Sequence, residues 1–172
     1  TFSIFFLICL VFKKLKFKDN KNMTYKIRYI KIQNKVIVLL AFYSGLRKNE
    51  LRSRQLKDLY IIDNNIYLDV NADGMKNLSI SLKTSNAKRR VQLMIDNMEH
   101  LAIVKEWMNI RLTLKFKSNY LFLKIVDNKI FSKIIDEEVF DKITFIIKKV
   151  TQRYATFHSF RHSFATYRLQ NI

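Results

Sequence analysis

The sequence has no proline, a single cysteine and only two glycines among its 172 residues. Because Cys9 stands alone, an internal disulfide is excluded, and a reducing, cytoplasmic compartment fits this composition. With so few glycines, most turns must be built by Asn, Asp and Ser. The sequence also lacks a zinc-spaced Cys/His set, a P-loop and an acidic metal cage. We therefore predict chemistry that needs neither a metal nor a cofactor.

Acidic residues are scarce relative to basic ones. There are 32 Lys and Arg against 14 Asp and Glu, which gives a formal net charge of +18. Such an excess makes a polyanion the natural partner, with nucleic acid first and an acidic membrane surface second. An AT-rich coding sequence would account for part of the lysine count. It would not account for arginines at the motif positions described below.

No apolar run is long enough to cross a bilayer. The longest, Phe2–Phe12, is followed by Lys13 and Lys14 and is preceded by no basic segment, so a signal peptide is a poor match. We expect it to be a buried helix or strand left from an upstream domain; the alternative is translated sequence that never folds. Since the chain begins at Thr1, we expect a fragment of a longer protein.

The pattern of the chain predicts a lead segment, residues 1–32, and a main domain, residues 33–172. Lys13–Lys31 is rich in Lys and Asn and is typical of a solvated basic linker. From Lys35 to Tyr43 apolar residues keep helical spacing, and Gly45 is placed to end that helix. A second helix is expected over Leu46–Arg54.

Beyond that point the pattern predicts a small sheet and then helices. Strands are expected at Tyr60–Ile62, Ile66–Val70, Leu78–Leu82 and Val91–Met94, with hairpin turns at Asp63–Asn65 and Ser85–Lys88. Helices are expected from a cap at Asp96 through Met98–Met108, over Ser132–Val150 and over Ser159–Leu169. Trp107 and the methionines near it are interpreted as core. The predicted fold is mainly α with a small antiparallel β-sheet inserted after its second helix.

Two arginines far apart in the sequence are suited to binding one phosphate. Arg47 begins the predicted second helix, and Arg161 lies three residues after His158 in the last helix. Guanidinium groups clamp the oxygens of a pentacoordinate phosphate without losing a proton. Removing one such donor typically costs about two to three orders of magnitude in rate. Taken singly, each arginine could equally be a solvated surface residue.

Two further residues are candidates for moving protons. Lys83 ends the predicted third strand, and nearby arginines could lower its pKa so that it protonates a leaving 5′-oxygen. His158 could help to deprotonate the attacking hydroxyl or assist the phosphate clamp. The alternative for His158, which lies beside Phe157 and Phe160, is a hydrogen-bonded core residue.

Supporting residues surround these candidates. Glu50 is predicted to orient Arg47 by ion pairing, although an ordinary helix-surface pair would look the same. His162 is assigned a structural or supporting role. A compact basic cluster at the predicted hairpin suggests contacts with the DNA backbone, and solvated charge is its alternative. This cluster consists of Lys88, Arg89 and Arg90.

Three segments together resemble the catalytic domain of the tyrosine recombinases, the phage integrase family. They read LLAFYSGLRKNEL, SLKTSNAKRRVQL and HSFRHSFATYRL. The resemblance covers roughly residues 35–172 and implies catalytic roles for Arg47, Lys83, His158 and Arg161. The implied reaction is cleavage of one strand of double-stranded DNA through a 3′-phosphotyrosyl link, followed by rejoining, by proteins that act as multimers on DNA. Type IB topoisomerases share these residues, so strand relaxation stays open as an alternative.

The sequence departs from the family in its last part. The family has a further His or Trp and then a nucleophilic tyrosine, and neither is found before Ile172. Tyr167 follows Arg161 by six residues, which turns it to another side of the helix, and Tyr154 fits no family position. We therefore expect a fragment from a bacterial-type, phage or mobile-element protein, inactive by itself. The alternatives are a degenerate DNA-binding remnant and a membrane-surface protein anchored by Phe2–Lys16.

Overall fold

A computed structural model describes residues 25–72, 88–114, 117–127, 129–152 and 156–170. The helices are α2 (Tyr25–Ser44), α3 (Lys48–Arg52), α4 (Met98–Thr113), α5 (Glu138–Thr151), α6 (Ser159–Gln170) and the 3-10 helix η1 (Leu56–Asp58). The strands are β1 (Leu59–Ile62), β2 (Asn65–Val70), β3 (Arg89–Leu93), β4 (Leu123–Val126) and β5 (Lys129–Ile134). The predicted fold class, mainly helical with small antiparallel sheets, is confirmed.

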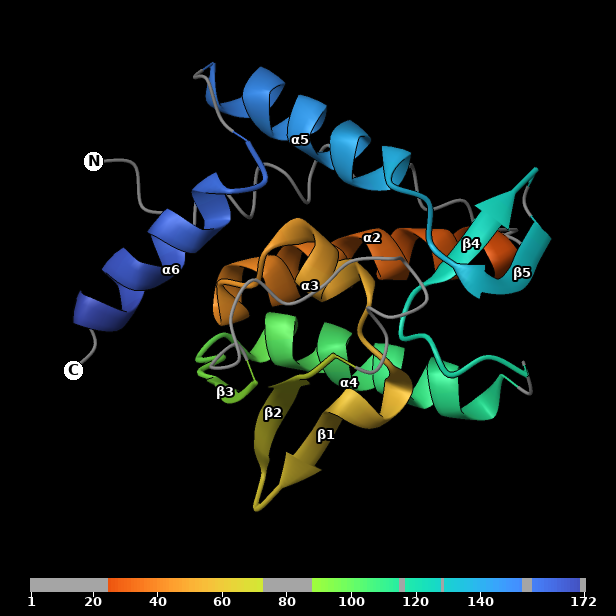
Figure 1. Cartoon of the computed structure of the whole chain (residues 1–172), viewed down its shortest axis with the longest axis horizontal. Helices are drawn as coiled ribbons and strands as arrows, with labels where there is room; N and C mark the ends of the chain where they lie inside the picture. Colours follow the sequence, from red (N-terminus) through yellow and green to blue (C-terminus); the bar gives the residue numbers. More distant parts are fainter. Residues whose placement is uncertain (1–24, 73–87, 115–116, 128, 153–155, 171–172) are drawn as a thin grey trace.

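Helix α2 is the centre of the fold. In Figure 1 it crosses the middle of the molecule, with α5 above it, α4 and the larger sheet below it, and α6 at one end. Its residues from Val36 to Tyr43 are all buried, as expected for a helix that is apolar around its whole circumference. It packs against α3, α4, α5, α6 and β3, so it holds together parts that are distant in the sequence.

The first helix begins earlier than the sequence predicts. The segment Lys13–Lys31 was expected to be a solvated linker, yet α2 already begins at Tyr25. Tyr29 and Lys31 are buried, and the Tyr29 ring packs 4.9 Å from that of Trp107. Tertiary packing thus overrides the polar composition at the start of this helix. Phe2–Phe12 lies outside the described residues.

The larger sheet is antiparallel, in the order β1-β2-β3. Asp63 and Asn64 have positive φ angles of 48° and 64°, so they form the tight turn between β1 and β2 that the sequence predicts. Strand β3 pairs with β2 from Ile66↔Leu93 to Val70↔Arg89. The expected strand Leu78–Leu82 lies outside the described residues, as do residues 85–87 of the expected hairpin tip.

One prediction after the first sheet is wrong. Residues 132–150 were expected to form one helix, but β5 runs to Ile134 and pairs with β4 before α5 begins at Glu138. Asp127, with a φ of 47°, lies between those two strands. The apolar residues of this hairpin are too closely spaced for periodicity alone to separate strand from helix.

Helix α4 also differs in detail from the prediction. Its cap is Asn97, whose side chain accepts a hydrogen bond from the His100 backbone N–H, and not Asp96. Trp107 is fully buried, as predicted, whereas Met98 is 75% exposed and does not belong to the core. No helix in the described part of the chain is long and apolar enough to span a membrane.

Candidate functional site

The junction between α2 and α3 brings the first and last motifs together. Gly45 ends α2 with a φ of 60°, a conformation that glycine adopts without strain. A Cβ atom there would collide with the ring of Phe164 from α6. The Arg161 guanidinium donates from Nη1 to the Gly45 carbonyl oxygen at 3.0 Å. The arginine of the last motif therefore lies beside the turn that leads into Arg47.

Glu50 joins Arg47 to Arg89 of strand β3. Its Oε2 accepts a hydrogen bond from the Arg47 backbone N–H at 2.8 Å, and its Oε1 lies 3.2 Å from Arg47 Nη1. The Arg89 guanidinium donates from Nη2 to Glu50 Oε2 at 3.1 Å. The pairing of Glu50 with Arg47 was predicted from their spacing. The pairing with Arg89 was not, because no sequence pattern reports a contact between a helix and a distant strand.

The ionisation of Glu50 reflects these contacts. Burial by itself raises the pKa of this carboxyl group, since the side chain is only 5% exposed. Hydrogen bonds from Arg89 and from the Arg47 backbone, together with the two guanidinium charges, outweigh burial and lower the pKa below its ordinary value. Glu50 is therefore ionised at neutral pH and holds both guanidinium groups in place.

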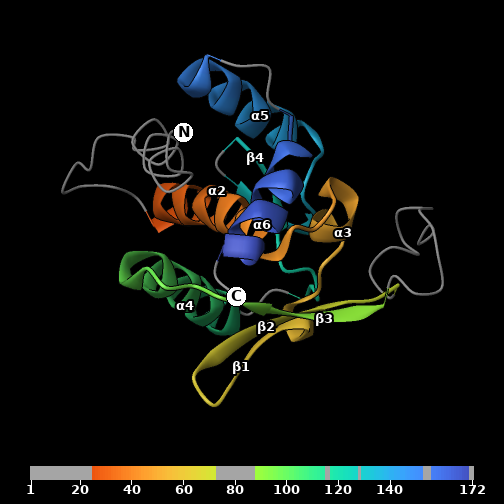
Figure 2. The same cartoon turned by 90° about the vertical axis from the view of Figure 1, so that its left-hand side faces the viewer.

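An open pocket of about 320 Å³ lies between α6, β3 and the end of α2. Figure 2 shows α6 in front of the end of α2, with β3 below it. We call it the arginine pocket. It is lined by Ser44, Gly45, Arg89, Arg90, Val91, Arg161, Phe164, Ala165 and Arg168. Its four guanidinium groups suit a phosphate or another anion.

The structure places some of the predicted site residues in the arginine pocket, one beside it and one outside it. Arg161 and Arg89 line the arginine pocket, and Arg47 is attached to it through Glu50, with 45% of the Arg47 side chain exposed. Arg90 also lines the pocket but pairs with Asp69 at 3.0 Å. Lys88 is exposed just before β3.

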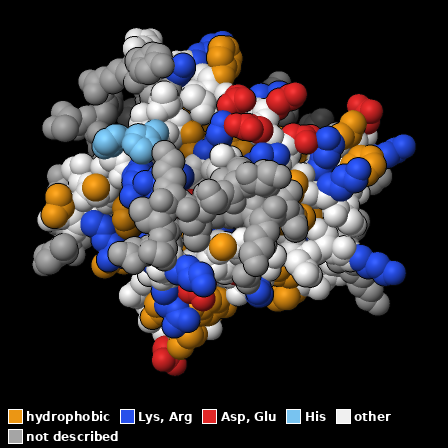
Figure 3. Space-filling model, viewed as in Figure 1, with side chains coloured by type: hydrophobic (Ala, Val, Ile, Leu, Met, Phe, Trp, Pro, Cys, Tyr) orange, Lys and Arg blue, Asp and Glu red, His pale blue; other side chains and the backbone are white. Residues whose placement is uncertain are grey.

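The two histidines of the last motif lie together at the surface. His158 and His162 are exposed, with ring centroids 4.9 Å apart and the rings nearly perpendicular. Figure 3 shows histidine side chains as a surface patch beside Lys and Arg side chains. The alternative of a core residue for His158 therefore does not hold.

Three residues weighed from the sequence cannot be placed in the site. Lys83 and Tyr154 lie outside the described residues. Tyr167 belongs to α6, but the structure does not describe its side chain. The role of Lys83 thus stays a prediction.

No pattern in the sequence pointed to Arg54, which is fully buried. Its guanidinium donates to the Glu50 carbonyl oxygen at 2.7 Å and to that of Asn71 at 2.8 Å, and it pairs with Asp58 at 3.3 Å. This network fixes the end of β2 against α3, which carries Glu50. In so basic a chain, an arginine four residues before an aspartate does not stand out, so this role could only be found in the structure.

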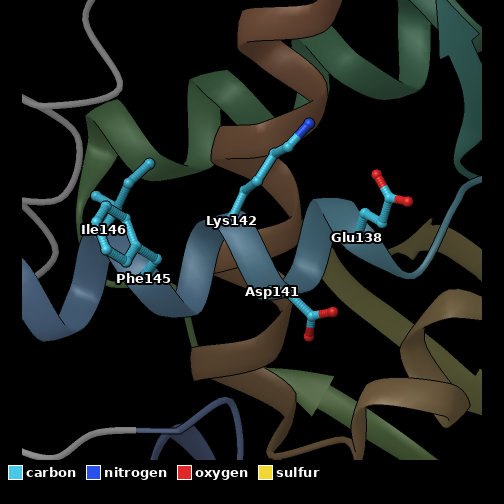
Figure 4. Close-up of a pocket in the computed structure, with 5 residues that line it drawn as sticks. All are labelled: Glu138, Asp141, Lys142, Phe145 and Ile146. Carbon is cyan, nitrogen blue, oxygen red and sulfur yellow. The ribbon is translucent and has the colours of Figure 1, made fainter.

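A second concave surface lies on α5 and has a different character. It has a volume of about 520 Å³ and is mostly apolar, and it is lined by Glu138, Asp141, Lys142, Phe145 and Ile146 (Figure 4). Nearby, Lys48 pairs with Glu137 and with Asp141. Its carboxylates would repel a phosphate, so the arginine pocket is the better anion site. In the described part of the chain, no three His, Cys, Asp or Glu residues gather as a metal site would require.

Comparisons with known proteins agree with this architecture. The family model described as "Phage integrase family" matches residues 13–171. The XerH site-specific recombinase bound to palindromic difH substrate, in a post-cleavage complex, matches with a TM-score of 0.61 at 20% identity, over 95% of this chain and 40% of that one. The XerA recombinase matches with a TM-score of 0.64 at 19% identity, over 99% of this chain and 50% of that one. At these identities the likeness shows the fold, and this chain spans half or less of those proteins. No curated protein matches the sequence.

Proposed function

This chain belongs to the phage integrase family, and on that basis we propose that it is part of a site-specific DNA recombinase whose arginine pocket binds the phosphate to be cleaved. The observation that carries the proposal is the contact of Arg161 with Gly45, two residues before Arg47, beside the pairing of Glu50 with Arg89. These contacts gather basic residues from three distant segments around one turn.

The proposed chemistry assigns charge stabilisation to the arginines. In the recombinase reaction a tyrosine oxygen attacks a DNA phosphorus, a 3′-phosphotyrosyl bond forms, and the bond to the 5′-oxygen breaks. The equatorial oxygens gain negative charge, which Arg161 and Arg47 stabilise. Lys83 protonates the leaving 5′-oxygen, and His158 assists proton transfer at the attacking hydroxyl. We assign the attacking tyrosine to no residue of this chain.

Glu50 has a positioning role in this proposal. Its buried carboxylate fixes the guanidinium of Arg89 and keeps Arg47 at the start of α3. Preorganised donors cost little reorganisation when charge develops on the substrate. Arg161 has no carboxylate partner among the described residues, so its full charge is available to the phosphate.

Double-stranded DNA is the proposed partner. The XerH structures are described as bound to a difH substrate, which is a finding about that protein. Here the support is the net charge of +18 and the arginine pocket. Assembly into a multimer on DNA remains part of the proposal.

Duplex binding measured by fluorescence anisotropy tests the proposal. The chain is expected to bind a generic 30-base-pair duplex with a Kd of about 10⁻⁶ to 10⁻⁴ M, and this affinity should weaken as the salt concentration rises. Arg161→Gln should weaken binding several-fold, whereas Lys129→Gln, at an exposed residue of β5, should not; Figure 1 shows β5 and α6 at opposite ends of the molecule. Equal losses for both variants would show that only net charge matters and would contradict the proposal.

A covalent-capture assay addresses the expected lack of activity. This chain, incubated with a nicked duplex that traps 3′-phosphotyrosyl links, is predicted to give no band that survives denaturing electrophoresis. A covalent band lost on Tyr167→Phe would overturn that prediction and assign the nucleophile to α6.

A further inference from the structure

One side of α6 carries a row of residues that the predicted site does not use in full. His158 lies just before α6, and Arg161, Ala165 and Arg168 follow within the helix at spacings of three, four and three residues, which place side chains along one side of a helix. The last three line the arginine pocket. Arg168 was not singled out from the sequence, and the chemistry proposed above gives it no role.

Arg168 differs from the two pocket arginines on β3 in its ion pairing. Arg89 pairs with Glu50, and Arg90 pairs with Asp69. Within the described residues, neither Arg161 nor Arg168 has a carboxylate at ion-pair distance. Among the described residues, the positive charge of the pocket that is not paired with an acid is therefore that of Arg161 and Arg168 on α6.

Arg168 is held in place without losing its charge. Its Nη2 donates to the Gln92 carbonyl oxygen of β3 at 3.1 Å, and its guanidinium lies 5.4 Å from the centroid of the Phe164 ring. One such hydrogen bond leaves most of the five guanidinium donors for another partner. Phe164 also lies against Gly45, whose carbonyl oxygen accepts the hydrogen bond from Arg161.

We propose that Arg168 binds a second DNA phosphate, on the same strand as the phosphate held at Arg161. Seven residues of helix separate the two arginines by about 10 Å along α6. Successive phosphates of one strand rise only about 3.4 Å along the DNA axis but also wind around it, so phosphates one or two steps apart match this separation. Ala165 lies between them, exposed and small, so the surface between the two guanidinium groups is left open for a DNA backbone. This inference rests on the proposed function, because it assumes that DNA enters the arginine pocket.

The salt dependence of duplex binding tests the proposal. We expect Arg168→Gln, which removes the charge but keeps a donor for the Gln92 carbonyl, to reduce the slope of log K against log[NaCl] by about 0.9. Arg168→Lys should keep the slope of the unmodified chain, and so should Lys129→Gln on β5. Thermal unfolding of each variant separates loss of a phosphate contact from loss of folding, since a purely structural role would move Tm and leave the slope unchanged.

Failure of the Arg168 contact and failure of DNA binding at the arginine pocket would give different results. A slope that is equal in Arg168→Gln and the unmodified chain, while Arg161→Gln lowers it, would overturn the role of Arg168 alone. If the unmodified chain bound no duplex in 50 mM salt, both proposals would fall. A lower slope in Arg168→Gln, restored in Arg168→Lys, is the result that we expect.

Discussion

Glu50 and Arg89 are 39 residues apart in the sequence, yet Glu50 Oε2 and Arg89 Nη2 lie 3.1 Å apart in the fold. The same carboxylate pairs with Arg47, three residues before it. A single buried acid thus connects the helix of the first motif to the strand that follows the second.

Replacing Glu50 should destabilise the fold. Glu50→Gln removes a buried carboxylate but leaves two partly exposed arginines that water can solvate. We expect a loss of about 1.5–3 kcal/mol in the free energy of unfolding, the range for hydrogen bonds to charged groups. Urea unfolding measures it, with Glu106→Gln, a half-buried partner of the exposed Arg28, as the control expected to stay within about 0.5 kcal/mol. Equal losses for both would contradict a special role for Glu50.

The pH dependence of stability should include a contribution from His100. Burial lowers the pKa of this imidazole, whose Nδ1 lies 2.9 Å from the Tyr43 hydroxyl oxygen. The folded state then favours the neutral ring, so its contribution is full above the ordinary pKa of about 6.5 and is lost as the pH falls below it. Unfolding free energies measured from pH 7.5 to 5 should fall less steeply in His100→Asn. Parallel profiles for the two proteins would refute this prediction.

Gly45 should tolerate no side chain. Gly45→Ala places a Cβ in a left-handed conformation, at a cost of about 1–2 kcal/mol, and drives it against the Phe164 ring. In a Phe164→Ala background only the backbone cost should remain. A double-mutant cycle by chemical unfolding measures the difference. Identical costs in both backgrounds would show that the ring does not contact this position.

Replacing the buried Arg54 should destabilise the fold strongly. Arg54→Met leaves the Asp58 carboxylate buried without its cation, for which we expect a loss of about 3–5 kcal/mol. Arg54→Lys should recover only part of it, because an ammonium group cannot reach Glu50, Asp69 and Asn71 together. Lys57→Met, at an exposed neighbour, is the control. Full recovery by lysine would mean that charge alone matters.

Local patterns in the sequence predicted the helices that carry the first and last motifs. They also predicted the ion pair between Arg47 and Glu50, which lie one helical turn apart. Gly45 and the three-residue spacing from Arg47 to Glu50 are local features, and the structure agrees with both. Contacts between distant elements left no such signal. The partners of Arg54 and the position of Arg168 against β3 depend on how elements pack, which no periodicity encodes.

The errors have physical causes as well. Around Ile130 the apolar residues fit either a short strand or a buried helix, so the β4–β5 hairpin was missed. Tyr29 and Lys31 are buried by packing, although their surroundings in the sequence are polar. Neither case could be decided without knowing which surfaces face each other.

The most direct test of the central claim is an NMR titration of the arginine side chains with duplex DNA, following the Nε–Hε signals of the labelled chain. We predict that Arg161, Arg168 and Arg89 shift first and together, while the buried Arg54 and Arg111 stay in place. A shift of Arg28 in α2, with Arg161 unchanged at saturation, would contradict the claim that the arginine pocket binds DNA.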